Sequence, residues 1–141
     1  MSFLAVWIML VAPPAEAPRP SRALGPAEVV RIVVEALRKN NSPLPNAGVF
    51  TAYQFASPAN HAVTGPYGHF LRTVKTKLFV PLFQDHPQEF GQIAVSGDYA
   101  EQILRLRLDD GRTASYKFVV SLQKQGARRG CWMVDGASRM P

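Results

Sequence analysis

The chain has 141 residues, of which 47% are apolar, and a formal net charge of +6, so its length supports one hydrophobic core and excludes a second domain of similar size. The excess of positive charge invites a nucleic-acid interpretation, but the lysines and arginines are dispersed, and the densest group is Lys124, Arg128 and Arg129. Because polyanion binding needs clustered cations, nucleic-acid binding is disfavoured and a solvated basic surface is the simpler interpretation.

Residues 1–25 differ in composition from the rest of the chain. The apolar run at residues 3–12 is too short to span a bilayer, so no transmembrane helix is expected. It is followed by Ala15-Glu16-Ala17, the small-x-small pattern of a signal-peptidase site. We therefore expect a signal peptide and a Pro/Ala-rich spacer, and a periplasmic or secreted protein. No Lys or Arg precedes the apolar run, which leaves a loosely docked tail on a cytoplasmic protein as the alternative.

Residues 26–141 are predicted to form a single α+β domain that begins with three helices. Pro26 suits the first position of a helix, and apolar side chains from Val29 to Leu37 share one face. Asn40 and the prolines that follow it end this helix. The second and third helices are expected at residues 49–56, before Ser57-Pro58, and at residues 66–79.

Strand-like alternation dominates the C-terminal third of the chain. Apolar residues occupy every second position from Leu104 to Leu108 and again from Ala114 to Leu122, which is typical of strands with one buried face. A two-residue turn would place the two apolar sets on opposite faces, whereas a three-residue loop that ends at Gly111 places them on the same face. The three-residue loop pairs Leu106 with Ala114, Leu104 with Tyr116, and Arg105 with Ser115.

The predicted sheet is antiparallel, starts at residues 92–95 and ends on a strand in which Trp132 and Val134 share a face. We expect Trp132 to be largely buried between the inner face of the sheet and the first helix. The outer face carries Ile103 and Val119 among basic residues, which makes it a candidate homodimer contact.

Three helices followed by an antiparallel meander resemble the cone-shaped α+β fold of the nuclear transport factor, ketosteroid isomerase and SnoaL-like (cystatin-like) group. More closely, residues 26–138 resemble the domain of unknown function 4864 family of bacteria and plants. This resemblance rests on Phe55-Ala56-Ser57-Pro58-Ala59-Asn60, on Thr64-Gly65-Pro66 leading into Phe70, and on Gly130-Cys131-Trp132-Met133-Val134-Asp135-Gly136. It implies three N-terminal helices packed on a curved antiparallel sheet, and it supports export because bacterial relatives often carry signal peptides. It implies no reaction.

The sequence offers little catalytic chemistry. The histidines His61, His69 and His86 show none of the close spacings common in metal sites, and the single cysteine, Cys131, excludes a second thiolate ligand. Ser96 lacks the Gly-x-Ser-x-Gly elbow of hydrolases, and no glycine-rich phosphate loop is present. We therefore expect no metal and no cofactor.

The candidate ligand-binding residues are Tyr53, His61, Tyr116 and Trp132, which we expect at the open end of the cone. Their rings can pack on a ligand while their polar tips orient it; the alternative is a place in the core or, for His61, in an exposed loop. With the apolar first helix, they predict a non-catalytic binding or protein-interaction module with an apolar pocket. Its ligand would be a small apolar or amphipathic molecule.

The alternative function is a small pocket enzyme of the isomerase or hydratase type that uses acid-base chemistry. Asp98 and Asp135 are the carboxylates available in or near strands. Both are more typical of turn or rim positions, and the apolar face of the first helix contains no tyrosine, aspartate or histidine. These features favour the binding module.

Overall fold

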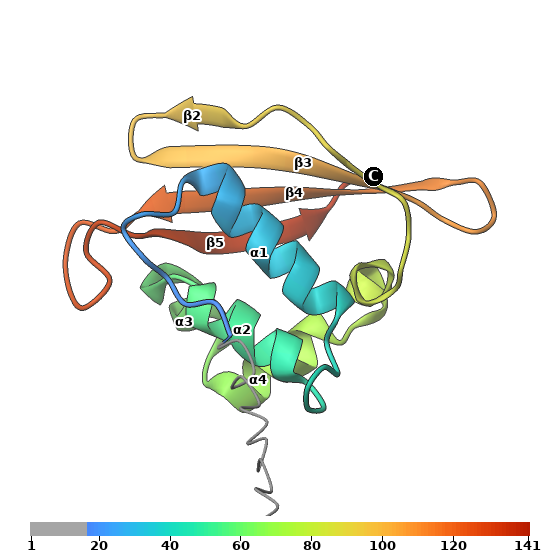
Figure 1. Cartoon of the computed structure of the whole chain (residues 1–141), viewed down its shortest axis with the longest axis horizontal. Helices are drawn as coiled ribbons and strands as arrows, with labels where there is room; N and C mark the ends of the chain where they lie inside the picture. Colours follow the sequence, from blue (N-terminus) through green and yellow to red (C-terminus); the bar gives the residue numbers. More distant parts are fainter. Residues whose placement is uncertain (1–16) are drawn as a thin grey trace, which may run out of the picture.

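The computed structural model describes residues 17–141, which form an α+β domain with an open antiparallel sheet (Figure 1). The expected signal segment at residues 1–16 lies outside the described residues. The helices are α1 (Pro26–Arg38), α2 (Ala47–Phe55), α3 (Pro58–Thr64), α4 (Tyr67–Val74) and the 3-10 helix η1 (Lys77–Phe83). The strands are β1 (Gln88–Phe90), β2 (Ala94–Ser96), β3 (Tyr99–Arg107), β4 (Thr113–Leu122) and β5 (Trp132–Arg139). Within residues 17–141, no helix has the length and apolar character needed to cross a membrane.

The sheet confirms the predicted hairpin. Its strand order is β1-β3-β4-β5, with β2 also paired to β3, and all pairs are antiparallel. Gly111 lies in the loop between β3 and β4 with φ of +85°, a conformation that glycine adopts without a steric cost. The register pairs Leu106 with Ala114, Leu104 with Tyr116 and Arg105 with Ser115, as the three-residue loop requires.

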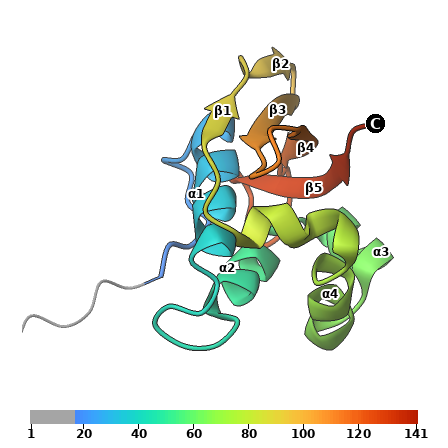
Figure 2. The same ribbon diagram turned by 90° about the vertical axis from the view of Figure 1, so that its right-hand side faces the viewer.

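The core lies between α1 and the inner face of the sheet, with α2, α3 and α4 below α1 (Figures 1 and 2). α1 begins as expected, with Pro26 in its first turn and Glu28 accepting a hydrogen bond from the backbone N–H of Gly25 at 3.2 Å. Its apolar face is buried against the inner side of β3 and β4. The fully or almost fully buried members include Val29, Val30, Val33, Val34, Leu37, Leu104, Leu106, Ala114, Tyr116, Phe118 and Val120.

The helices α1 and α2 cross in close contact at Gly48, which is buried. A Cβ atom on Gly48 would lie 2.7 Å from the Cα of Asn40 and closer still to the carbonyl oxygen of Ala36. The buried Asn40 side chain strengthens the crossing, because its Oδ1 accepts a hydrogen bond from the N–H of Val49 at 2.9 Å. The two helices therefore meet through backbone atoms, which fixes their separation.

The prediction of three N-terminal helices is not confirmed, because residues 17–141 form five helices. The dipeptide Ser57-Pro58 ends α2 but also starts α3: the Ser57 hydroxyl accepts a hydrogen bond from the N–H of Asn60 at 3.2 Å, and Pro58 takes the first helical position. The helix expected at residues 66–79 divides after α4, because Thr76 is extended and a 3-10 helix that contains Pro81 follows. The short strand β1 also lies before the predicted start of the sheet.

Trp132 shares the inner phase of β5 with Val134, as expected, because the two residues pair with Leu122 and Val120 of β4. It packs against the core, in line with the expected burial, but it is not completely enclosed. The reason is its position as the first residue of β5, where the strand leaves the exposed β4–β5 loop.

Candidate functional site

A cavity of about 260 Å³ lies between the helices and the C-terminal strands. It opens to the surface beside α3, where the lining residue Val63 is 88% exposed. Four phenylalanine rings and several aliphatic side chains form most of its wall. The lining residues are Val33, Leu37, Ala52, Asn60, Val63, Thr64, Phe70, Thr73, Val74, Phe79, Leu82, Phe83, Phe118, Val134, Asp135, Gly136 and Ala137.

The one carboxylate in this lining, Asp135, sits in a β-bulge. In the β4–β5 ladder Val120 pairs with Val134 and Val119 pairs with Gly136, so Asp135 has no partner across the ladder. The bulge also brings Ala137 opposite Phe118, and both of these residues line the cavity. One extra residue in the edge strand thus places an acidic residue at a mostly apolar wall.

Two serine hydroxyls hold the Asp135 carboxylate. Ser57 Oγ donates to Asp135 Oδ1 at 2.7 Å, and Ser121 Oγ donates to the same oxygen at 2.8 Å. Ser57 is 1% exposed and begins α3, whereas Ser121 lies on β4. The side chain of Asp135 is therefore fixed by contacts from two separate elements, and this leaves its second oxygen, Oδ2, without a hydrogen bond from residues 17–141.

The α2–α3 junction is joined to β5 directly at Val134. The N–H of Ser57 and the side-chain amide of Asn60 donate to the carbonyl oxygen of Val134 at 2.9 and 3.2 Å, and Ala56 forms an isolated parallel bridge to the same residue. Thr64 Oγ1 in turn donates to the Asn60 carbonyl oxygen at 2.9 Å. These bonds connect α3 to the edge of the sheet at one side of the cavity.

The structure thus gathers the three sequence segments that we had treated only as a family resemblance. Residues 55–60 and 130–136 contact one another through Ser57, Asn60, Val134 and Asp135, and Phe70 lines the same cavity. We had not identified Ser57, Asn60 or Thr64 as site residues. The available signals were Ser-Pro, which is typical of a helix start, and Asp-Gly inside a strand, which is typical of a bulge.

Two of the predicted ligand-binding residues, Tyr53 and His61, lie in direct contact. Their rings stack with centroids 4.4 Å apart and an interplanar angle of 10°, and the His61 Nε2 atom is 2.9 Å from the Tyr53 carbonyl oxygen. Tyr53 also packs edge-on against Tyr67 and Phe70. These aromatic contacts connect α2 with α3 and α4. They lie next to the cavity, because Phe70 is one of its lining residues.

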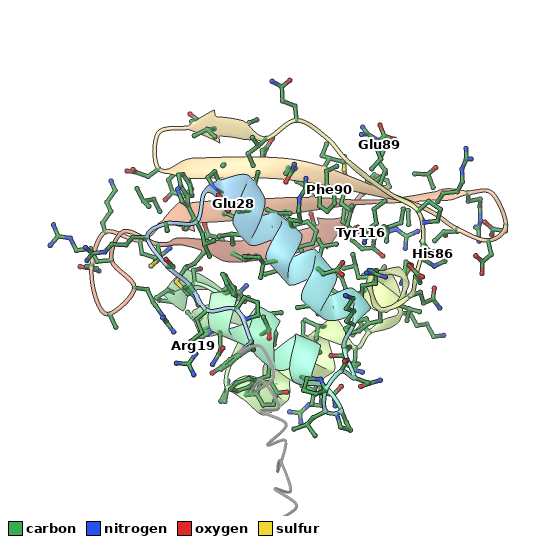
Figure 3. The ribbon with its side chains drawn as sticks, viewed as in Figure 1. Arg19, Glu28, His86, Glu89, Phe90 and Tyr116 are labelled. Carbon is green, nitrogen blue, oxygen red and sulfur yellow. The ribbon has the colours of Figure 1, made fainter. Side chains whose placement is uncertain are left out.

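The other two predicted residues lie elsewhere. Tyr116 is buried at the sheet, beside α1 (Figure 3), where its hydroxyl donates to the carbonyl oxygen of Leu78 and stands 3.4 Å from the Arg139 guanidinium. Burial raises the pKa of Tyr116, although the Arg139 charge opposes this effect. Trp132 lies at the start of β5. None of Tyr53, His61, Tyr116 and Trp132 is among the described residues that line the cavity.

We expect Tyr116→Phe to lower the free energy of unfolding by about 0.5–1.5 kcal/mol at neutral pH, because it removes the hydrogen bond to Leu78. The folded-state pKa of Tyr116 is raised above its ordinary value of about 10. The stability contributed by its neutral hydroxyl is therefore fully present below about pH 10 and is lost as the pH rises from there through the folded-state pKa. Denaturant titrations across this range should show a smaller alkaline loss in Tyr116→Phe. The matched variant Tyr99→Phe, at a position that is 61% exposed, should retain the full loss.

The second carboxylate considered for acid-base chemistry, Asp98, is not part of the cavity wall. It forms an ion pair with Lys124 at the β4–β5 end of the sheet, and this pairing raises the pKa of Lys124. Residues 17–141 also contain no group of three histidine, cysteine, aspartate or glutamate side chains that could hold a metal ion. The polar chemistry of the cavity therefore centres on Asp135.

No protein-family model matches this chain, and neither does any curated protein or solved structure.

Proposed function

We propose that this domain binds a small, largely apolar molecule in the cavity between its helices and β4–β5, without transforming it. The observation that carries the proposal is a cavity of about 260 Å³ whose wall is mostly aliphatic and phenylalanine side chains, with one fixed carboxylate. Ligand sites commonly combine such an apolar wall with a few placed polar groups. The volume lies just below the range of about 300–1,000 Å³ typical of drug-sized ligands, so a compact molecule is favoured.

We propose further that the domain has the cone-shaped fold suggested by the family resemblance. The arrangement in Figure 2 supports this, because α1 covers one face of the antiparallel sheet while α2, α3 and α4 lie below it.

We also propose a homodimer that forms through the outer face of the sheet. That face carries the half-buried Ile103 and Val119 beside the Lys117–Glu101 ion pair, with an N–O distance of 3.7 Å. Export of the protein, which the composition of residues 1–25 predicts, also remains a prediction.

The enzyme alternative depends on Asp135, since this carboxylate lines the cavity. Proton-transfer enzymes usually pair a base with a second group that stabilises the developing charge. No tyrosine, histidine, lysine or arginine is present among the described lining residues, and Tyr116 and His61 direct their polar atoms to backbone carbonyls elsewhere. The geometry therefore favours binding over catalysis.

Filling the cavity tests the proposal. Val74 on α4 lines the cavity and is half-buried, so Val74→Phe should occupy part of the cavity volume. It should weaken binding of 2-phenylethanol, a neutral apolar probe, by about five-fold or more, as overpacking costs of about 1–3 kcal/mol imply. Isothermal titration calorimetry measures the affinity, and circular dichroism checks that the variant is folded.

The matched control is Val80→Phe, the same substitution at a position that is 42% exposed and outside the described lining. It should bind the probe as the wild type does. Equal affinities for wild type and Val74→Phe would show that the probe binds elsewhere and would remove the support for this cavity as the binding site.

A further inference from the structure

Each side-chain donor group of the described cavity wall has a hydrogen-bond partner within the protein, and only the Asn60 amide keeps a second hydrogen. Asn60 Nδ2 donates to the Val134 carbonyl oxygen at 3.2 Å, and Thr64 Oγ1 donates to the Asn60 carbonyl oxygen at 2.9 Å. Thr73 Oγ1 donates to the His69 carbonyl oxygen at 3.0 Å. Each threonine hydroxyl has a single hydrogen, so within the described residues these two hydroxyls offer a ligand only acceptor lone pairs.

Asp135 adds the strongest acceptor in the wall. A carboxylate accepts hydrogen bonds and donates none. Both serine bonds go to Oδ1, at 2.7 and 2.8 Å, so Oδ2 accepts no hydrogen bond from residues 17–141 and keeps its full acceptor capacity. Because two hydroxyls already fix the side chain, a ligand does not have to immobilise it, and this favours a strong bond to Oδ2.

Positive charge is missing from the described part of the wall. None of the lining residues is lysine, arginine or histidine. Lys75 touches one lining residue, with its ammonium 4.9 Å from the centroid of the Phe83 ring, but does not itself line the cavity. An anionic ligand would thus lose its hydration without gaining a partner of opposite charge, which is costly in an apolar site.

From this one-sided polarity we infer that the cavity selects molecules in which a cationic, donor-rich group such as an ammonium is joined to a compact apolar body. The ammonium bonds to Asp135 Oδ2 and the apolar body contacts the phenylalanine rings, whose faces also attract cations. The inference rests on the proposed binding function. It runs against the net charge of +6, which taken alone would favour anionic ligands.

Three probes that differ in one group test this inference at neutral pH: 2-phenylethylamine, 2-phenylethanol and phenylacetate. Calorimetric titration of the full chain should rank the amine first, the alcohol second and the carboxylate last. Asp135→Asn retains one oxygen that can accept the hydrogen bonds of Ser57 and Ser121. It replaces the second oxygen, Oδ2, with an NH2 group, which donates hydrogen bonds. It should lower the affinity for the amine by about ten- to a hundred-fold, the range expected for a hydrogen bond to a charged group, and lower the affinity for the alcohol by less.

Glu89→Gln is the matched control, because it removes the same charge from an exposed position on β1 (Figure 3). It should preserve the ranking. If the alcohol binds but the amine has no advantage, or if Asp135→Asn leaves the amine affinity unchanged, the inference is overturned while the binding function stands. If phenylacetate binds most tightly, the inference is likewise wrong. If none of the three probes binds, the proposed function fails, and the inference with it.

Discussion

Replacing Gly48 with alanine is expected to lower the free energy of unfolding by at least about 3 kcal/mol, the upper end of the usual cost of overpacking. The added methyl group would meet the backbone of Ala36 in α1 and of Asn40 just after it, and backbone atoms cannot rotate away as a side chain can. The helices would have to separate, which would also stretch the bond between Asn40 Oδ1 and the N–H of Val49. Chemical denaturation followed by circular dichroism measures the loss.

Gly68→Ala is the matched control, because nothing lies within 4 Å of a Cβ atom at this position in α4. Alanine favours the helix over glycine by about 0.5–1 kcal/mol, so this variant should equal or exceed the wild type in stability. Similar stabilities for the Gly48 and Gly68 variants would show that the α1–α2 crossing adapts without cost.

Phe55→Ala is expected to lower the free energy of unfolding by about 3–5 kcal/mol, as for other fully buried phenylalanines. Phe55 is 0% exposed and ends α2, directly before the junction that bonds to Val134. The loss should appear as a lower midpoint in a denaturant titration with an unchanged slope, because the extent of unfolding stays the same.

Phe50, which also lies on α2, provides the control for Phe55→Ala. Phe50 is 48% exposed and packs edge-on against Tyr67 with centroids 5.7 Å apart, so Phe50→Ala should cost less than about 1 kcal/mol. If Phe50→Ala and Phe55→Ala lost equal stability, the assignment of the buried face of α2 would be wrong.

The loop and the register of the β3–β4 hairpin were predictable from the sequence, although β3 begins at Tyr99, before the predicted alternation. Period-two alternation fixes which side chains share a face, and a slip by one residue would expose the whole apolar set, so only one loop length fits. α1 was predictable for a similar reason, since a long amphipathic stripe between Pro26 and Arg38 has few competing interpretations. Where the local pattern is this strong, tertiary contacts have little further influence on the secondary structure.

The helices between α1 and the sheet were less predictable. The sequence indicates only a helix end at Ser57-Pro58, although proline at the first helical position also marks a helix start, and the choice between the two depends on what the chain packs against. The same applies to Thr76, whose extended backbone divides α4 from η1. Short helices gain most of their stability from tertiary packing, which one sequence does not display.

The cavity could be predicted as apolar but not as a set of residues. Its polar edge joins α3 to β5 across 78 positions of the chain, from Ser57 to Asp135, and depends on a bulge that only the three-dimensional pairing reveals. The residues predicted to bind a ligand were Tyr53, His61, Tyr116 and Trp132, because each of these residue types combines a ring with a polar atom. Type alone does not tell whether a hydroxyl faces a cavity or, as for Tyr116, a backbone carbonyl.

The bulge at Asp135 has a consequence for how the specificity of such a domain can change over evolution. A residue outside the strand ladder has no partner directly opposite it, so any side chain that still accepts the hydrogen bonds of Ser57 and Ser121 can replace it while the pairing of Val120 with Val134 and of Phe118 with Ala137 is retained. Ligand preference and sheet stability are then largely independent traits. Descendants of one scaffold could exchange an amine for another head group by substituting a single edge residue.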